Sequence, residues 1–134
     1  MIDLGILGGD WVRCVANDIN SRGQVAGVCW KESGLESRAI LWTRNDGMVD
    51  LGNLDAALIN CAAEGINGRG DVVGTCRATG QGHGFFWTKR HGMVDLGTLG
   101  GSSSEARAVN DRRQVAGFSH LSAGGSHAVI WTIR

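Results

Sequence analysis

The chain of 134 residues repeats one set of landmarks three times, and this repetition constrains its fold more than any other feature. The landmarks are a Met-x-Asp-Leu-Gly stretch, an Asn-x-x-x-x-Val-x-Gly stretch and an apolar run that ends in Trp-Thr. They lie at Met1–Leu7, Met48–Leu54 and Met93–Leu99; at Ile19–Gly27, Ile66–Gly74 and Val109–Gly117; and at Ala39–Thr43, Gly84–Thr88 and Ala128–Thr132. Because the order never changes, we divide the single domain 1–134 into units 1–47, 48–92 and 93–134.

Each unit is expected to form four short β-strands. The chain has 22 glycines and no proline, which favours strands joined by tight turns, and no stretch shows a sustained helical period. In unit 1 the expected strands are the Met1–Leu7 stretch and residues 12–19, 24–29 and 38–43. The predicted fold class is therefore all-β.

Four short strands cannot bury their apolar faces alone, so the units are expected to stack as propeller-type blades. If a blade takes the second, third and fourth strands of one unit and the first strand of the next, Met1–Leu7 completes the last blade beside Ala128–Thr132. Two arrangements satisfy this pattern. One is a six-bladed dimer in which each copy lends its first strand, and the other is a monomer closed as a threefold β-prism or β-trefoil.

Several segments resemble the HAF repeat family, named for a His-Ala-Phe tripeptide. The resemblance covers nearly the whole chain and is carried by Asp3–Gly9, Asp95–Gly101, the Ile-Asn-x-x-Gly-x-Val-x-Gly segments and His83-Gly-Phe-Phe-Trp87. Unit 2 departs from it, with Asp55-Ala56 in place of a double glycine. The resemblance implies a β-propeller-like fold in an extracellular or periplasmic protein, although no signal peptide is recognisable. It therefore favours the six-bladed dimer and supplies no catalytic residue.

Three sets of recurring residues are expected to be structural. The tryptophans are large enough to anchor the packing between blades, the aspartates suit a turn or ladder hydrogen bond, and the asparagines suit turns. These sets are Trp42, Trp87 and Trp131; Asp3, Asp50 and Asp95; and Asn20, Asn67 and Asn110. They are read as anchors of the repeat and not as a site.

Two histidines share a position that an arginine occupies in unit 1. His83 and His127 each precede the repeat tryptophan by four residues, and Arg38 stands at the third equivalent place. We expect these histidines to form hydrogen bonds between blades, with ligand binding as the functional alternative. Arg38 cannot be a metal ligand and no zinc-type spacing is present, so neither a metal nor another cofactor is expected.

The four cysteines occupy two repeat positions that are both serine in unit 3. Cys14 and Cys29 correspond to Cys61 and Cys76, and to Ser104 and Ser119. If Asn20 faces Gly23 across a two-residue turn, Cys14 lies opposite Cys29, within disulfide reach.

A type I turn with a glycine bulge instead places Asn20 opposite Gln24 and separates the two sulfurs. The sequence leaves both registers open, and small buried thiols are expected in preference to disulfides.

Charge limits the partners of the chain. With 13 basic and 13 acidic residues the formal net charge is zero, so no nucleic-acid surface is expected. The apolar runs are too short for a membrane span. The predicted partner is a second copy of the chain, together with a glycan or protein ligand.

Binding residues are expected where the units differ. Trp11 and Trp30 have no counterpart in units 2 and 3, and three variable loops, 31–37, 78–82 and 120–126, fall at one equivalent place. The candidate ligand-binding residues are Trp11, Trp30, His83 and His127. The predicted function is a non-catalytic binding or interaction module.

Two alternatives remain open. A hydrolase would need side chains such as Asp10, Glu32, Glu64 or His83 to converge at the centre of an assembled ring. A purely structural repeat protein would need no ligand at all.

Overall fold

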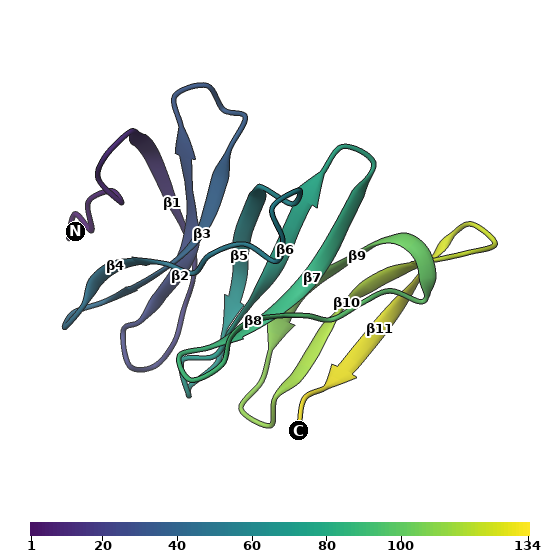
Figure 1. The fold of residues 1–134 in the computed structure, drawn as a ribbon. Helices are drawn as coiled ribbons and strands as arrows, with labels where there is room; N and C mark the ends of the chain where they lie inside the picture. The colour runs from purple at the N-terminus through teal and green to yellow at the C-terminus, as the bar shows by residue number, and fades with distance from the viewer.

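A computed structural model describes all residues 1–134 and contains eleven β-strands and no α-helix (Figure 1). No segment is thus a helix of the length and apolarity that crossing a membrane requires. The strands are β1 (Trp11–Ile19), β2 (Val25–Lys31), β3 (Ser37–Thr43), β4 (Gly47–Asp50), β5 (Asn60–Ile66), β6 (Val72–Ala78), β7 (Gln81–Thr88), β8 (Gly92–Asp95), β9 (Gly100–Val109), β10 (Gln114–Leu121) and β11 (Ser126–Thr132). The all-β prediction is confirmed.

The strands form three antiparallel meanders, which we call blades. Blade 1 is β1–β4, blade 2 is β5–β8, and blade 3 is β9–β11 with only three strands. The fourth strand of blades 1 and 2 comes from the start of the next repeat unit, in the order expected. Single parallel bridges, Ser37 with Asn60 and Gly82 with Ser103, join neighbouring blades into one open sheet. Figure 1 shows the blades side by side in a row that runs from the N-terminus to the C-terminus.

The row of blades does not close on itself. Residues 1–7 form no strand and do not pair with β11, and the two chain ends lie at opposite ends of the row (Figure 1). A strand needs a neighbouring edge to satisfy its backbone groups, and the edges of β3 and β7 are within reach of β4 and β8, whereas β11 lies across the whole row from Met1. The closed threefold β-prism or β-trefoil monomer is therefore wrong. So is closure of blade 3 by the chain's own first strand.

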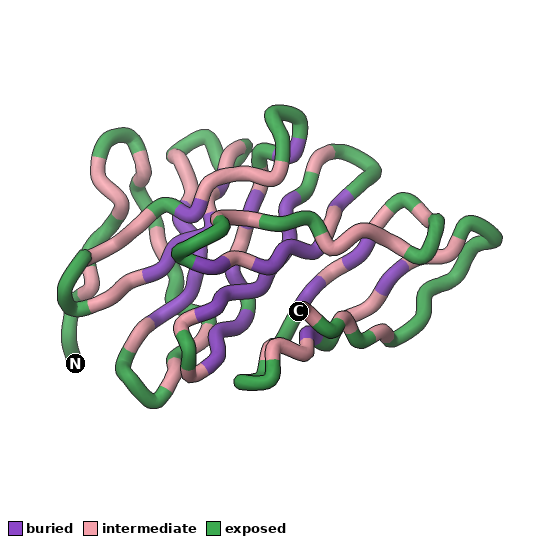
Figure 2. The backbone as a smooth tube through the Cα atoms, turned by 60° about the horizontal axis from the view of Figure 1, so that its bottom comes forward, coloured by how far each residue is buried: buried purple, intermediate pink, exposed green.

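Apolar side chains fill the two spaces between blades, and Figure 2 shows the buried backbone segments gathered in the middle of the row. The cluster between blades 1 and 2 includes Leu41, Val72 and Phe85, and a smaller cluster between blades 2 and 3 includes Phe86 and Val115. The half-buried repeat tryptophans contribute unequally. Trp87 packs against the first cluster and Trp131 against the second, while Trp42 belongs to neither. Each interior face of a blade is thus covered by its neighbour, and the two outer faces have no neighbouring blade.

Both registers considered for the cysteine strands occur, one in each half of the hairpin. Next to the turn, the Asn20 amide donates to the Gln24 carbonyl and Gly23 has a φ of 74°, as the type I turn with a glycine bulge requires. A β-bulge at Asn17 then shifts the pairing by one residue. Beyond the bulge Cys14 lies opposite Cys29. The two candidate registers are therefore not alternatives, because the bulge converts one into the other.

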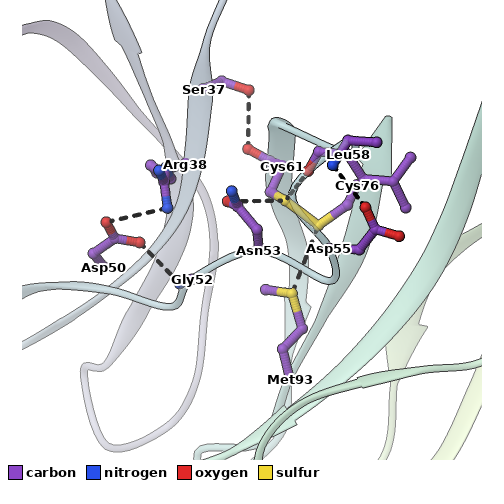
Figure 3. Close-up of a disulfide and its surroundings, with 11 residues drawn as sticks. Ser37, Arg38, Asp50, Gly52, Asn53, Asp55, Leu58, Cys61, Cys76 and Met93 are labelled. Atoms are coloured by element: carbon purple, nitrogen blue, oxygen red, sulfur yellow. Dashed lines mark hydrogen bonds and ion pairs between the residues drawn. A yellow bond between two sulfur atoms is a disulfide. The ribbon is translucent and has the colours of Figure 1, made fainter. Parts of the chain in front are cut away.

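The cysteines form two disulfides, so the expectation of free thiols is wrong. Cys14 is bonded to Cys29 and Cys61 to Cys76, with Cα–Cα distances of 4.1 and 4.0 Å. Figure 3 shows the Cys61–Cys76 bond, with the Met93 sulfur 3.6 Å from the Cys76 sulfur. The bulge that brings the sulfurs together was not visible in the sequence.

Blade 3 replaces the disulfide with two buried serines. Ser104 accepts a hydrogen bond from the Gly84 amide and donates one to the Gly97 carbonyl, at 3.0 and 2.7 Å. Ser119 accepts one from the Leu99 amide at 2.7 Å. The joint change from cysteine to serine therefore exchanges a covalent link for hydrogen bonds to neighbouring loops and strands.

The repeat asparagines both close a turn and link the blades. Asn67 Oδ1 accepts from the Arg69 and Asp71 amides at 3.0 and 2.9 Å, and its Nδ2 donates to the Asn110 carbonyl at 3.0 Å. Asn20 Nδ2 donates in the same way to the Asn67 carbonyl at 2.9 Å. The turn role expected from the sequence is therefore accompanied by a relay that runs from blade 1 to blade 3.

The repeat aspartates each shape a sharp bend. Oδ1 of Asp3, Asp50 and Asp95 accepts from the amide of the glycine two residues later, at 2.8 Å in all three units. The glycines that follow have positive φ angles, 82° at Gly5 and 91° at Gly52, which only glycine adopts without cost.

Candidate functional site

The largest hollow of the molecule is a groove between blades 1 and 2. Its volume is about 600 Å³, within the range of small-ligand sites. It lies where β2 and β3 meet the start of β5, beside the bridge between Ser37 and Asn60. The polar and aromatic side chains that line it are Asn17, Trp30, Ser37, Asn60, Glu64, Arg77 and Thr79.

Trp30 is the aromatic wall of the groove. It follows the second cysteine of unit 1 on β2, and strand alternation places it on the same face as Val28, which also lines the groove. The Arg13 guanidinium lies 4.8 Å from the centre of the indole ring, so a cation covers part of the ring while the residue as a whole stays half-exposed. Trp30 can therefore offer remaining ring surface to a ligand.

Polar groups of the groove divide into those already bonded and those left free. Ser37 donates its hydroxyl to the Cys61 carbonyl at 3.1 Å, and Asn17 donates its Nδ2 to the Ala63 carbonyl at 2.9 Å. Both residues thus serve the junction between blades 1 and 2. The side chains of Asn60 and Glu64 have no hydrogen-bond or ion-pair partner among those found in the chain, so they face the groove with their full bonding capacity.

Two of these polar residues occupy equivalent bulge positions. Asn17 is the extra residue in β1 and Glu64 the extra residue in β5, and Arg107 takes the same place in β9. A bulge turns the side chain of its extra residue away from the regular alternation of the strand. The three bulges therefore present three different side chains, an amide, a carboxylate and a guanidinium, at one repeated location.

An ion-pair network lies at the end of the groove nearest blade 3. Arg77 and Arg107 both form salt bridges with Glu105. Burial alone would raise the pKa of Glu105, but the hydrogen bonds and positive charges of the two arginines outweigh it and hold the pKa below its ordinary value of 4.5. Arg77 is thereby fixed between blades 2 and 3, with its charge next to the groove.

Trp11, the second unmatched tryptophan, has two cations of the chain near its ring and does not line the groove. The Lys31 ammonium lies 5.2 Å and the Arg38 guanidinium 5.9 Å from its ring centre. Both cations bond to Glu36, at 2.7 and 3.2 Å. These hydrogen bonds hold the pKa of the Glu36 carboxyl below its ordinary value. Trp11 is thus part of a packed surface network at one end of blade 1.

The two candidate histidines lie apart, on different blades. His83 on β7 bonds through Nδ1 to the Asp95 carboxylate on the adjacent strand β8, at 2.8 Å. This bond lies within blade 2 and does not cross to a neighbouring blade. His127 on β11 has no equivalent partner, because blade 3 has no fourth strand. Neither histidine lines the groove.

Within one chain, the side chains considered for catalysis do not converge. Asp10 lies 3.6 Å from Lys31, His83 is paired with Asp95, and Glu64 is the one carboxylate that lines the groove. No group of three or more His, Cys, Asp or Glu side chains is placed to hold a metal ion. The groove supplies an aromatic surface and hydrogen-bonding groups, with a single carboxylate and no histidine in its lining.

Sequence reasoning identified Trp30 but missed Asn60 and Arg77 as groove residues. Arg77 occupies the repeat position of Trp30, directly after the second cysteine, and His120 occupies it in unit 3. This variation at one fixed position was a usable signal. Asn60 carried no signal, because its place in the groove depends on the packing of blade 2 against blade 1.

Comparisons with models of protein families, with curated proteins and with solved structures gave no match for this chain.

Proposed function

We propose that this protein is a non-catalytic binding module that takes a glycan in the groove between blades 1 and 2. The observation that carries the proposal is the half-exposed Trp30 ring beside the unpartnered Asn60 and Glu64 side chains in a groove of about 600 Å³. Sugars present an apolar C–H face and a rim of hydroxyls. An indole ring suits the first, and amide and carboxylate groups suit the second.

The lining of the groove supports binding over hydrolysis. Glycoside hydrolysis uses two carboxyl groups on either side of the bond that breaks, and Glu64 is the single carboxylate in the lining. A glycan bound here would contact Glu64 as a hydrogen-bond acceptor, with Arg77 as a donor at the far end.

We further propose that the working form is a six-bladed ring of two copies related to HAF-type repeat proteins. Each chain supplies three blades, and six is the only multiple of three within the range of about four to eight blades over which propellers close. The open row of blades, with an incomplete third blade, supports this assembly.

A glycan array followed by NMR titration of the best glycan tests the ligand. We expect amide shifts confined to the groove and at least a tenfold weaker affinity for Trp30→Ala, because the stacking surface is lost. Trp11→Ala is the matched control. It removes the other unmatched tryptophan of blade 1, which lies outside the groove, and should leave the affinity unchanged.

Two results would refute the glycan proposal. One is an array without a hit at millimolar glycan, which would favour a purely structural protein or a protein ligand. The other is binding that Trp30→Ala and Trp11→Ala weaken equally, which would place the ligand elsewhere.

A further inference from the structure

The two ends of the row carry complementary halves of an interface that the chain already forms twice internally. In blades 1 and 2 the edge of β3 or β7 is covered by β4 or β8, with Leu41 opposite Val49 and Phe86 opposite Val94. The equivalent residue on β11 is Ile130, whose strand pairs with β10 on one edge and has no strand on the other. Leu41 and Phe86 are 7% and 3% exposed, whereas Ile130 is 63% exposed.

The segment that could cover this edge is present and already shaped. Residues 1–5 match 48–52 and 93–97, which begin in β4 and β8, except that Ile2 replaces a valine. Asp3 accepts from the Gly5 amide as Asp50 and Asp95 do from their glycines. The segment nevertheless forms no strand, and its Ile2 is 68% exposed. The local turn is therefore formed while its strand partner is missing.

We propose that residues 1–4 of a second copy pair with β11 and complete blade 3, and that the reciprocal exchange closes the ring of two copies. Repeat equivalence defines the register, with Met1, Ile2 and Asp3 opposite Trp131, Ile130 and Val129. This inference takes up the six-bladed ring proposed above and does not depend on the glycan.

Blades 1 and 2 already contain the side-chain pairs that the exchanged strand would form with β11. Asp50 forms a salt bridge with Arg38 at 3.8 Å, and Asp95 one with His83 at 2.8 Å. The equivalent pair is Asp3 of one copy with His127 of the other. Within one chain neither carboxylate nor imidazole has this partner.

Blades 1 and 2 also contain the backbone hydrogen bonds that the exchanged strand would form. The Leu51 amide donates to the Ala39 carbonyl at 3.0 Å, and the Leu96 amide to the Gly84 carbonyl at 2.9 Å. The exchange extends this pattern to the Leu4 amide and the Ala128 carbonyl of the other copy. The asparagine relay continues likewise, from Asn110 Nδ2 to the Asn20 carbonyl of the other copy.

An apolar groove on the outer face of blade 1 receives the incoming blade 3. Its volume is about 270 Å³, and its lining includes Ile2, Leu4, Val15, Val25 and Ile40. Val25 and Ile40 occupy the repeat positions of Val72 and Phe85, which lie in the cluster between blades 1 and 2. The outer face of blade 1 thus has the composition of a face that a blade covers. Trp42, the repeat tryptophan that packs against neither cluster, belongs to the same blade, whose outer face has no neighbouring blade.

Light scattering after gel filtration tests the assembly. We expect a mass twice the 14.2 kDa of one chain, and a fall to half that mass for Ile130→Glu, which puts a charge in the middle of the exchanged strand. The matched control is Leu35→Glu. Leu35 is also exposed, at 74%, but lies in the turn between β2 and β3, so its substitution should leave the mass doubled. Circular dichroism should show that each variant keeps its strands.

Cross-linking tests the exchange itself. In the double variant Ile2→Cys/Ile130→Cys the new thiols lie opposite each other only across two copies, so a disulfide-linked dimer should appear on a non-reducing gel. Leu35→Cys/Ile130→Cys is the control and should stay unlinked. Because Ile2 and Ile130 lie at opposite ends of one chain, a link within a chain does not produce the same band.

Each outcome has a distinct meaning. A doubled mass with the cross-link supports the exchange, and a doubled mass without it overturns the exchange while leaving the six-bladed ring to another contact. A wild-type mass of one chain overturns both, and masses that grow beyond two copies replace the closed ring with an open head-to-tail array. Glycan binding by the Ile130→Glu monomer reports on the ligand groove separately.

Discussion

Removing the Cys61–Cys76 disulfide should destabilise the protein strongly. The bond closes a loop with a sequence separation of 15 residues, and restricting such a loop in the unfolded chain is worth about 3 kcal/mol at 25 °C. Both cysteines are fully buried in the cluster between blades 1 and 2, so losing the two sulfurs also removes packing. We expect Cys61→Ala/Cys76→Ala to lower the free energy of unfolding by about 3–4 kcal/mol.

Urea unfolding followed by tryptophan fluorescence measures this change. In reducing buffer the wild type should lose both disulfides and become less stable. The double variant should lose its remaining disulfide, Cys14–Cys29, and become less stable as well. Ser104→Ala/Ser119→Ala is the control at the equivalent position of blade 3. It removes hydrogen bonds and no covalent link, so the destabilisation that it causes should be the same in oxidising and in reducing buffer. A loss below about 1 kcal/mol in the cysteine variant, or titratable thiols in the denatured oxidised protein, would refute the reasoning.

Two further predictions concern the junctions between blades. Asn67→Ala should lower the free energy of unfolding by about 2–3 kcal/mol, because Asn67 is buried and its four side-chain hydrogen bonds hold a turn and reach blade 3. Urea unfolding should show a smaller loss for Asn110→Ala. Equal losses for the two variants would contradict the relay. Glu105→Gln should flatten the dependence of melting temperature on pH between about pH 5 and 3. Because the pKa of Glu105 is lowered in the folded state, its carboxylate stabilises the fold at pH values above its ordinary pKa of 4.5, and this contribution is lost as the pH falls through the folded-state pKa. Melting temperatures of wild type and variant that change with pH in parallel would contradict this prediction.

Much of the local structure could be predicted from the repeats. The strand order within a blade, the use of the next unit's first strand and the Asn20 turn all follow from landmarks that recur at fixed spacing. The cysteine pairing did not follow, because two turn geometries place Asn20 opposite different residues. The bulge at Asn17 decided it, and no residue type marks such a bulge reliably.

The ligand groove was predicted in one part only. Trp30 could be singled out because it breaks the repeat. Its neighbours Asn60 and Glu64 come from β5 of the next blade, so their approach depends on how two sheets pack. Trp11 breaks the repeat equally well but lies outside the groove, beside Lys31 and Arg38, a difference that strand alternation alone does not reveal.

The amino-acid sequence by itself determined that the chain is all-β and built from repeated blades, because alternating apolar residues and turn residues act within a few positions of one another. Tertiary structure alone decided that the row stays open. Whether Met1–Leu7 reaches β11 depends on the rotation that each blade adds to the next, and that rotation accumulates from the packing between sheets. The same packing separates Ile2 and Ile130 within one chain and leaves both exposed.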